Sequence, residues 1–241
     1  MAQIKSIEIE EHPYKELSGL TVQLALTNSE IINSGIQKGG IWFLDSKIII
    51  MGTFPPKKEY FGRKGYVHFP SSKNQFWKHI DKVYGSFLYA ALNKSEMDSE
   101  RVKNAKAKIT FARNQNIGFV DIFSKIKRKA DTVKDDDLET FETVFDNGIM
   151  DNLLSHQVNQ FFFVYSKARD IFLSEYKKHN FIEPKLIRPY RSGGVLLEVF
   201  ELCVDGRRIY LCYAPIHGPN AWSEKQKAMK MAFDYAFLDG N

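Results

Sequence analysis

The feature that most constrains the fold is a short apolar run that ends abruptly in a turn. Residues 48–51 read IIIM, and Gly52 follows them. Four consecutive apolar residues suit a strand that is covered on both faces, as in a parallel sheet. Pro55 and Pro56 then exclude both a helix and a paired strand, so the chain must turn. Because ligands bind outside the carboxyl edge of open α/β sheets, this turn is the first candidate for a functional site.

A helix is predicted after the turn and the basic loop that follows it. Ser72 and Gln75 have the spacing of a capping box, so we expect a helix from about Lys73 to Tyr84. The free N–H groups at such a helix start attract phosphate. Basic residues flank the turn, the loop and a later segment, and they would line a cleft for phosphate: Lys57, Lys58, Arg63, Lys64, Lys73 and Arg191.

Strands and helices alternate along the rest of the chain. The apolar and amphipathic patterns predict strands at 117–122, 161–165, 196–204 and 207–213, and helices at 99–112, 138–156, 167–179 and 223–238. Asp205-Gly206 is typical of a type I′ hairpin turn, and Ser223 with Gln226 forms a second capping-box pattern. Residues 124–137 read as a surface loop, basic in its first half and acidic in its second.

This alternation predicts an α/β fold, a three-layer α/β/α sandwich around a central, mainly parallel sheet of about four strands. We expect a single domain over residues 1–241, in which residues 1–45 form an N-terminal extension. Four strand ends would then meet at one edge of the sheet.

Composition excludes several classes of protein. Hydrophobic residues make up 44% of the 241 residues, which supports a sizeable core and argues against disorder. Cys203 and Cys212 lack C-x-x-C spacing, so we expect no structural zinc site and no iron–sulfur cluster. We also expect no other metal and no cofactor. No apolar run approaches membrane-spanning length, and we expect a cytoplasmic protein, nucleoid-associated in a prokaryote. The net charge of +5 is compatible with a polyanionic partner.

Residues 52–78 resemble motif 1 of the uracil-DNA glycosylase superfamily. The pattern is G-T-F-P-P after a buried strand, then Y-x-x-F-P-x-x-K-N-Q-F-W-K before a helix. It resembles the mismatch-specific branch and, more closely, the hypoxanthine (deoxyinosine) branch. Residues 117–121, IGFVD, are similar to the second-strand I-G-L-x-D of the latter, and residues 214–221 resemble a divergent second motif. The resemblance covers residues 45–235 in order.

The resemblance implies a monofunctional DNA glycosylase that excises a deaminated base, uracil or hypoxanthine, in base excision repair. Position 54 is Phe, as in the hypoxanthine branch, and Asn74 matches the Asn that is held to carry catalysis there. His217 would assist at the leaving base. The implied base-binding residues are Gly52, Thr53, Phe54, Pro55, Tyr66, Asp121 and Ser166. The implied DNA-binding residues are Lys57, Lys58, Lys73, Arg191, Gly218, Pro219 and Asn220. We expect a monomer whose partner is damaged DNA and which has no membrane contact.

The residue types suit this chemistry. The target base must leave the duplex, and stacking on an aromatic side chain such as Phe54 stabilises it by ~1–3 kcal/mol. The carboxamide of Asn74 can hold a water or donate to a base. His217 can stabilise the departing base or bind a phosphate.

Structural readings of the same residues stay open. Phe54 could be a core residue, Asn74 a first-turn helix residue and His217 a surface histidine. Asp121 and Ser166 could cap the segments that follow them, and the basic residues 125–129 could be a solvated stretch. Two other functions also stay open. One is a non-catalytic member that binds DNA or a nucleotide, since the second motif has Ile216 and His217 in place of small polar residues. The other is a hydrolase of nucleotides or small molecules on a similar sheet.

Overall fold

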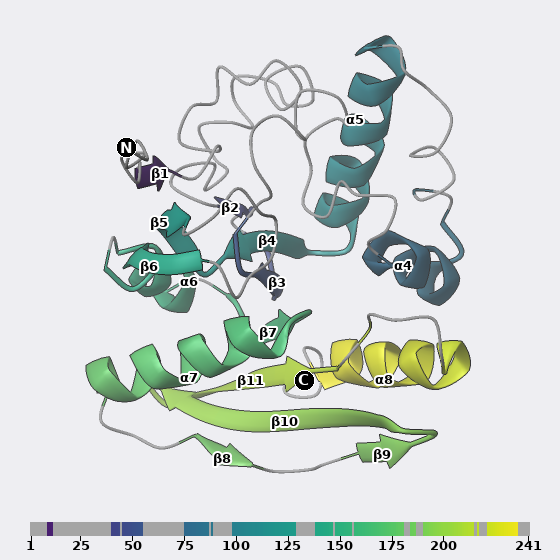
Figure 1. Ribbon diagram of the computed structural model, residues 1–241. Coiled ribbons are helices and arrows are strands. Elements are labelled where there is room, and N and C mark those ends of the chain that lie inside the picture. The colour runs from purple at the N-terminus through teal and green to yellow at the C-terminus, as the bar shows by residue number, and fades with distance from the viewer. Residues whose placement is uncertain are drawn as a thin grey trace, which may run out of the picture.

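The computed structural model describes residues 9–11, 40–43, 45–54, 75–86, 88, 98–128, 138–146, 148–155, 157–180, 184–186, 190–214, 216 and 221–235. Two sheets and five helices lie within these residues (Figure 1).

The larger sheet has the strand order β2-β4-β3-β7-β11-β10-β8, and β9 pairs with β10. Its strands are β2 (Gly40–Ile41), β3 (Ile48–Gly52), β4 (Ile117–Asp121), β7 (Gln160–Phe163), β8 (Lys185–Leu186), β9 (Tyr190–Ser192), β10 (Val195–Val204) and β11 (Arg207–Tyr213). The pairs β4–β3, β3–β7 and β7–β11 are parallel. The strands β2, β8, β9 and β10 pair antiparallel. The sheet is therefore mixed, and it is wider than the four strands that the sequence predicts.

Helices cover both faces of this sheet. On one face lie α4 (Phe76–Tyr84), α5 (Asp98–Asn114) and α8 (Trp222–Asp234), and on the other lie α6 (Ile149–Ser155) and α7 (Ser166–Asn180). The run 48–51 explains why both faces need cover. Ile48 and Ile50 join the core cluster under α4, α5 and α8, whereas Ile49 and Met51 join the cluster under α6 and α7. All four side chains are 0% exposed, so the predicted α/β class is confirmed.

The hairpin prediction is confirmed as well. Val204 pairs with Arg207 across the turn, and Asp205 and Gly206 have φ values of 49° and 77°. Both central residues of a type I′ turn require positive φ, which Asp tolerates and Gly adopts without strain. The turn thus sets the register of β10 on β11.

The second sheet, in the order β1-β5-β6, corrects two predictions. Residues 124–128, predicted as the start of a surface loop, belong to β5 (Phe123–Arg128), and the start of the helix predicted at 138–156 is β6 (Leu138–Thr143). The third strand is β1 (Ile9–Glu11). Phe123 and Ile126 of β5 are 0% exposed. Their burial and the pairing of β5 with β6 favour strands, although the composition of β5 is typical of a loop and that of β6 is typical of a helix.

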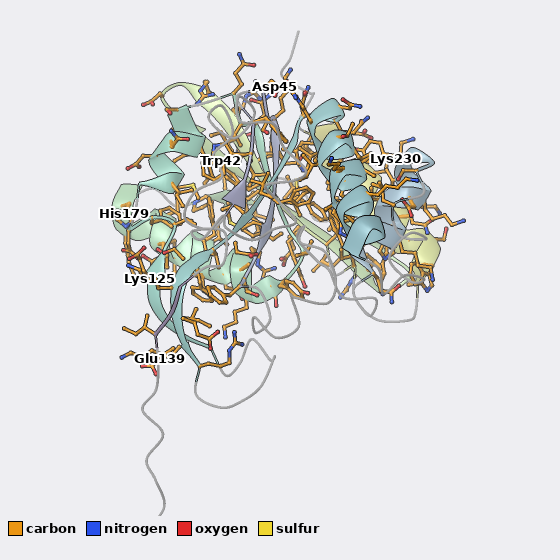
Figure 2. The ribbon with its side chains drawn as sticks, turned by 90° about the horizontal axis from the view of Figure 1, so that it is seen from above. Trp42, Asp45, Lys125, Glu139, His179 and Lys230 are labelled. Carbon is orange, nitrogen blue, oxygen red and sulfur yellow. The ribbon has the colours of Figure 1, made fainter. Side chains whose placement is uncertain are left out.

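The basic residues of β5 meet carboxylates from its neighbours. Lys125 Nζ lies 2.6 Å from Glu142 Oε2 of β6, and Arg128 Nε lies 2.8 Å from Glu10 Oε1 of β1. Arg128 also donates from Nη2 to Glu10 Oε2 at 3.0 Å. Figure 2 shows Lys125 on one side of the molecule and Lys230 of α8 on the other.

The two capping-box predictions are wrong. The helix α4 begins at Phe76 with Gln75 at its N-cap, and α8 begins at Trp222 with Ala221 at its N-cap. Neither N-cap side chain makes a capping hydrogen bond. Ser223 falls inside the first turn of α8, where its hydroxyl cannot cap the helix, and Ala221 instead turns the chain with a left-handed φ of 58°.

The packing around β4 requires a glycine at position 118. A Cβ at this position would stand 2.7 Å from Trp42 Cβ and 2.7 Å from Ile49 Cδ1. Only glycine lets these side chains approach the strand this closely.

Among the described helices, none is both long and apolar enough to cross a membrane.

Candidate functional site

The carboxyl ends of four neighbouring strands lie at one edge of the larger sheet. Met51 of β3 is in register with Val120 of β4 and Phe163 of β7, and Phe163 is in register with Tyr213 of β11. Gly52 pairs with Asp121 one residue further on. The segments that leave these strands therefore start at a common level, as in α/β sheets that bind ligands at this edge.

The first of these segments is held by main-chain hydrogen bonds. The carbonyl of Gly52 accepts from the N–H of Ile122 at 2.9 Å, and the carbonyl of Thr53 accepts from the N–H of Phe123 at 3.1 Å. Thr53 is buried, and Phe54 is half-buried against the cluster under α6 and α7. Phe54 therefore combines the two readings of the sequence, because it packs against the core and is still partly exposed.

Two other predicted base-binding residues lie at the same edge with different exposure. Asp121 ends β4 and is 5% exposed, whereas Ser166 opens α7 and is exposed. Beside Ser166, the guanidinium of Arg169 lies 4.6 Å from the centre of the Tyr213 ring. Arg169 also pairs with Glu198 and with Asp170. The sequence reading did not single out this cation–aromatic pair, because its members lie 44 positions apart in the chain.

The remaining predicted site residues fall into two groups. Ten lie outside the described residues: Pro55, Lys57, Lys58, Tyr66, Lys73, Asn74, His217, Gly218, Pro219 and Asn220. Arg191 is described, and it is an exposed residue of β9 that pairs with Leu196. In the turn after β9, a Cβ at Gly193 would stand 2.6 Å from Cγ of Glu224. Arg191 thus lies in the hairpin that approaches the first turn of α8.

His79 of α4 connects the two loops that carry the predicted catalytic residues. Its Nε2 lies 3.1 Å from the carbonyl oxygen of Ile216, which immediately precedes His217. Its main-chain N–H donates to the carbonyl of Gln75 at 3.0 Å, and Gln75 immediately follows Asn74. Segments separated by 137 positions are joined through this residue.

The imidazole of His79 also stacks on Trp222, the first residue of α8. Their ring centres are 4.6 Å apart with an interplanar angle of 29°. The ammonium of Lys78 lies 4.2 Å from the centre of the Trp222 ring, a cation–π distance. Figure 1 shows α4 and α8 side by side at this end of the sheet, in agreement with their contacts.

The electrostatics of His79 follow from its burial. The side chain is 0% exposed, and burial lowers its pKa to about 4, with smaller contributions in the same direction from Lys225 and Lys78. The imidazole is therefore neutral at pH 7. Because a carbonyl only accepts, Nε2 carries the proton, and Nδ1 is left without a hydrogen-bond partner among the described residues.

A second buried base lies on the other side of α4. Lys108 of α5 is 1% exposed, and its ammonium lies 4.9 Å from the centre of the Trp77 ring. Burial lowers the pKa of Lys108 to about 7, and the carboxylate of Asp81 opposes this shift. Asp81 itself accepts from the Ser86 hydroxyl at 2.6 Å and from the Leu88 N–H at 2.7 Å.

The sequence contained a signal for His79 but none for Lys108. His79 falls at the helical spacing of the apolar residues Phe76, Ile80 and Val83, so an imidazole stands within the buried stripe of α4. A lysine in a charged helix gives no such signal, because lysines are almost never fully buried.

Within the described part of the chain, no group of three or more His, Cys, Asp or Glu side chains is arranged to hold a metal ion. No protein-family model matches the sequence, and neither a curated protein nor a solved structure is significantly similar to it.

Proposed function

We propose that the chain is a monofunctional DNA glycosylase of the uracil-DNA glycosylase type, with a fold of that superfamily, which hydrolyses the N-glycosidic bond of a deaminated base. The proposal rests on the sequence pattern of residues 52–78. The observation that supports it most is the His79 hydrogen bond to Ile216, which brings the segment after motif 1 against the second loop. A site built from two loops requires this proximity.

The proposed reaction needs few groups. Breakage of the N-glycosidic bond develops positive charge on the sugar and negative charge on the leaving base, and water then adds to the sugar. In this proposal the carboxamide of Asn74 positions the water, Phe54 stacks on the extruded base and His217 stabilises the departing base. The half-burial of Phe54 at the sheet edge supports its role as a platform.

The departure of the second motif at position 216 has a packing explanation. Ile216 is 0% exposed and belongs to the core cluster under α4, α5 and α8. A large apolar residue at this position therefore serves the core.

The catalytic assignment is tested with oligonucleotides that contain one uracil or one hypoxanthine, single-stranded and double-stranded. We expect single-turnover base release on at least one substrate, and we expect Asn74→Ala to slow it by roughly 100-fold or more, the scale of a lost catalytic group. Asn152→Ala is the matched control, because Asn152 is an exposed residue of α6.

Three outcomes separate the alternatives. Unchanged activity in Asn74→Ala contradicts the catalytic role of Asn74. Salt-dependent DNA binding without base release on any substrate favours a non-catalytic DNA-binding protein. Turnover of free nucleosides without DNA affinity favours a hydrolase of small molecules.

A further inference from the structure

The residues on either side of the segment 217–220 contact one and the same side chain, that of His79. Ile216, the residue before it, accepts the Nε2–H of His79 at 3.1 Å. Trp222, two residues after it, stacks on the same imidazole at 4.6 Å. The stack and the hydrogen bond use different parts of the ring, so both contacts are made at once.

The main chain of the same residue belongs to the first turn of α4. The His79 N–H donates to Gln75 at the start of α4, and the buried neighbours Phe76, Trp77 and Ile80 fix this helix on the sheet. His79 is thus a rigid connection between Gln75, next to Asn74, and Ile216, next to His217.

We propose that His79 is a positioning residue that clamps Ile216 and Trp222 onto helix α4 and thereby positions the loop between them, which carries His217. Its catalytic consequence rests on the proposed glycosylase function, whereas the clamp itself does not. Catalytic groups that are displaced by about 1 Å can lose 100-fold in rate, so a residue that touches neither base nor sugar can control the chemical step.

The chemical state of the ring suits this role. A neutral imidazole with its proton on Nε2 donates to the carbonyl and presents a flat apolar face to the indole. Burial keeps the ring in this neutral state, with a pKa of about 4. The clamp therefore does not titrate in the range where most cells work.

Two substitutions separate the two contacts of the clamp. In His79→Gln the side-chain amide nitrogen can reach the position of Nε2, so the hydrogen bond to Ile216 is retained and the stack is lost. In His79→Phe the stack on Trp222 is retained and the donor is lost, which leaves a buried carbonyl unsatisfied. Val83→Ala, on the same face of α4, is the control for a loss of packing without a loss of either contact.

The experiment measures three quantities for each variant: the single-turnover rate of base release, the Kd for damaged DNA, and the hydrogen exchange of peptides that span residues 214–221. For His79→Phe we expect a rate at least ~10-fold lower, a Kd changed by less than ~3-fold, and faster exchange confined to residues 214–221. We expect His79→Gln to restore most of the rate and of the protection, and Val83→Ala to leave the ratio of rate to affinity unchanged.

The failures of the clamp and of the function are distinguishable. If both His79→Phe and His79→Gln keep the wild-type rate of hydrogen exchange at residues 214–221, the clamp is overturned, whatever the protein does to DNA. If His79→Phe increases hydrogen exchange over all of α4 and the sheet, and His79→Gln does not restore the wild-type rates, His79 has a purely structural role. That result also overturns the proposal. A wild-type protein that releases no base refutes the proposed function, and the exchange measurement then decides the clamp by itself.

Discussion

On each side of helix α4 a buried basic side chain contacts an indole, but the two side chains differ in the interactions that compensate for their burial. Toward α8, His79 is neutral, donates a hydrogen bond to Ile216 and stacks on Trp222. Toward α5, the amine of Lys108 lies over the Trp77 ring, and its burial lowers the pKa to about 7 against the opposing effect of Asp81.

The difference shows what burial of a base costs. An imidazole loses its charge easily and still donates a hydrogen bond, so His79 connects two segments at little electrostatic cost. An alkyl ammonium must be desolvated or deprotonated, and an indole face compensates for only part of that cost. We therefore expect the α8 side to govern activity and the α5 side to govern stability.

Removal of the two indoles tests this division and has the largest expected effect. Trp77 is 0% exposed and packs on Phe119 with ring centres 5.5 Å apart, so Trp77→Ala should destabilise the protein by about 3–5 kcal/mol. Trp222 is half-buried, so Trp222→Ala should cost about 1–2 kcal/mol and lower base release more than its stability loss explains. Urea unfolding and activity, measured on both variants, make the comparison. Equal stability losses would remove the proposed division.

Replacement of Lys108 by Met should stabilise the protein. The pKa of Lys108 is lowered from 10.5 to about 7 in the folded state, so below pH 10.5 the unfolded chain binds a proton that the folded chain does not. Stability is thereby lost as the pH falls from 10.5 to 7, by about 4–5 kcal/mol in total. Lys108→Met should recover this amount at pH 7 and roughly half of it at pH 9. Urea unfolding at both pH values measures it, and a variant that is less stable at both would contradict the desolvation account.

Acid should act on the other side of α4. The pKa of His79 is lowered from 6.5 to about 4, so between these pH values only the unfolded chain gains the proton, and stability falls as the pH drops. The loss from pH 7 to pH 4 should be on the order of 2–3 kcal/mol. His79→Gln lacks this titration, so the difference between its unfolding free energy and that of the wild type should narrow or reverse toward pH 4. Parallel pH curves for the two proteins would show that His79 is not the titrating group.

Exposed cations extend the contrast with a smaller effect. Arg191 is exposed near the start of α8, whereas Lys125 of β5 pairs with Glu142 on the other side of the molecule (Figure 2). If DNA lies along the proposed site, Arg191→Ala should weaken binding and reduce the slope of log K against log salt by about 0.9, the value for one phosphate contact. Lys125→Ala should leave the slope unchanged. The reverse ranking would place the DNA on the β5 side.

Local sequence patterns predicted the parts of the fold that depend on near neighbours. The run 48–51 gave a buried strand, because alternate residues face two covered sides, and Asp205-Gly206 gave the hairpin, because its turn needs positive φ at both positions. The strands β5 and β6 could not be predicted in this way. They are formed by burial of Phe123 and Ile126 and by pairing with strands that are distant in sequence, as the ion pairs of Arg128 with Glu10 and of Lys125 with Glu142 show.

For the candidate site, the sequence predicted the common edge and missed the side chains that hold it together. Four strand ends were expected at one edge, and the register of β3, β4, β7 and β11 places them there. The connection from His79 to Ile216 could not be predicted, because it depends on how α4 and α8 pack. The capping boxes failed for a related reason: the Ser and Gln spacing occurs, but the helices begin elsewhere.

The most direct measurement of the central claim is the quantity of free base that the purified wild-type chain releases from duplexes with a single uracil or a single hypoxanthine, read by mass spectrometry. The account predicts stoichiometric release of one of these bases from damaged duplexes, with an intact sugar–phosphate backbone and no release from undamaged DNA. Absence of free base from every damaged duplex and single strand, with the protein folded and in excess, would contradict it.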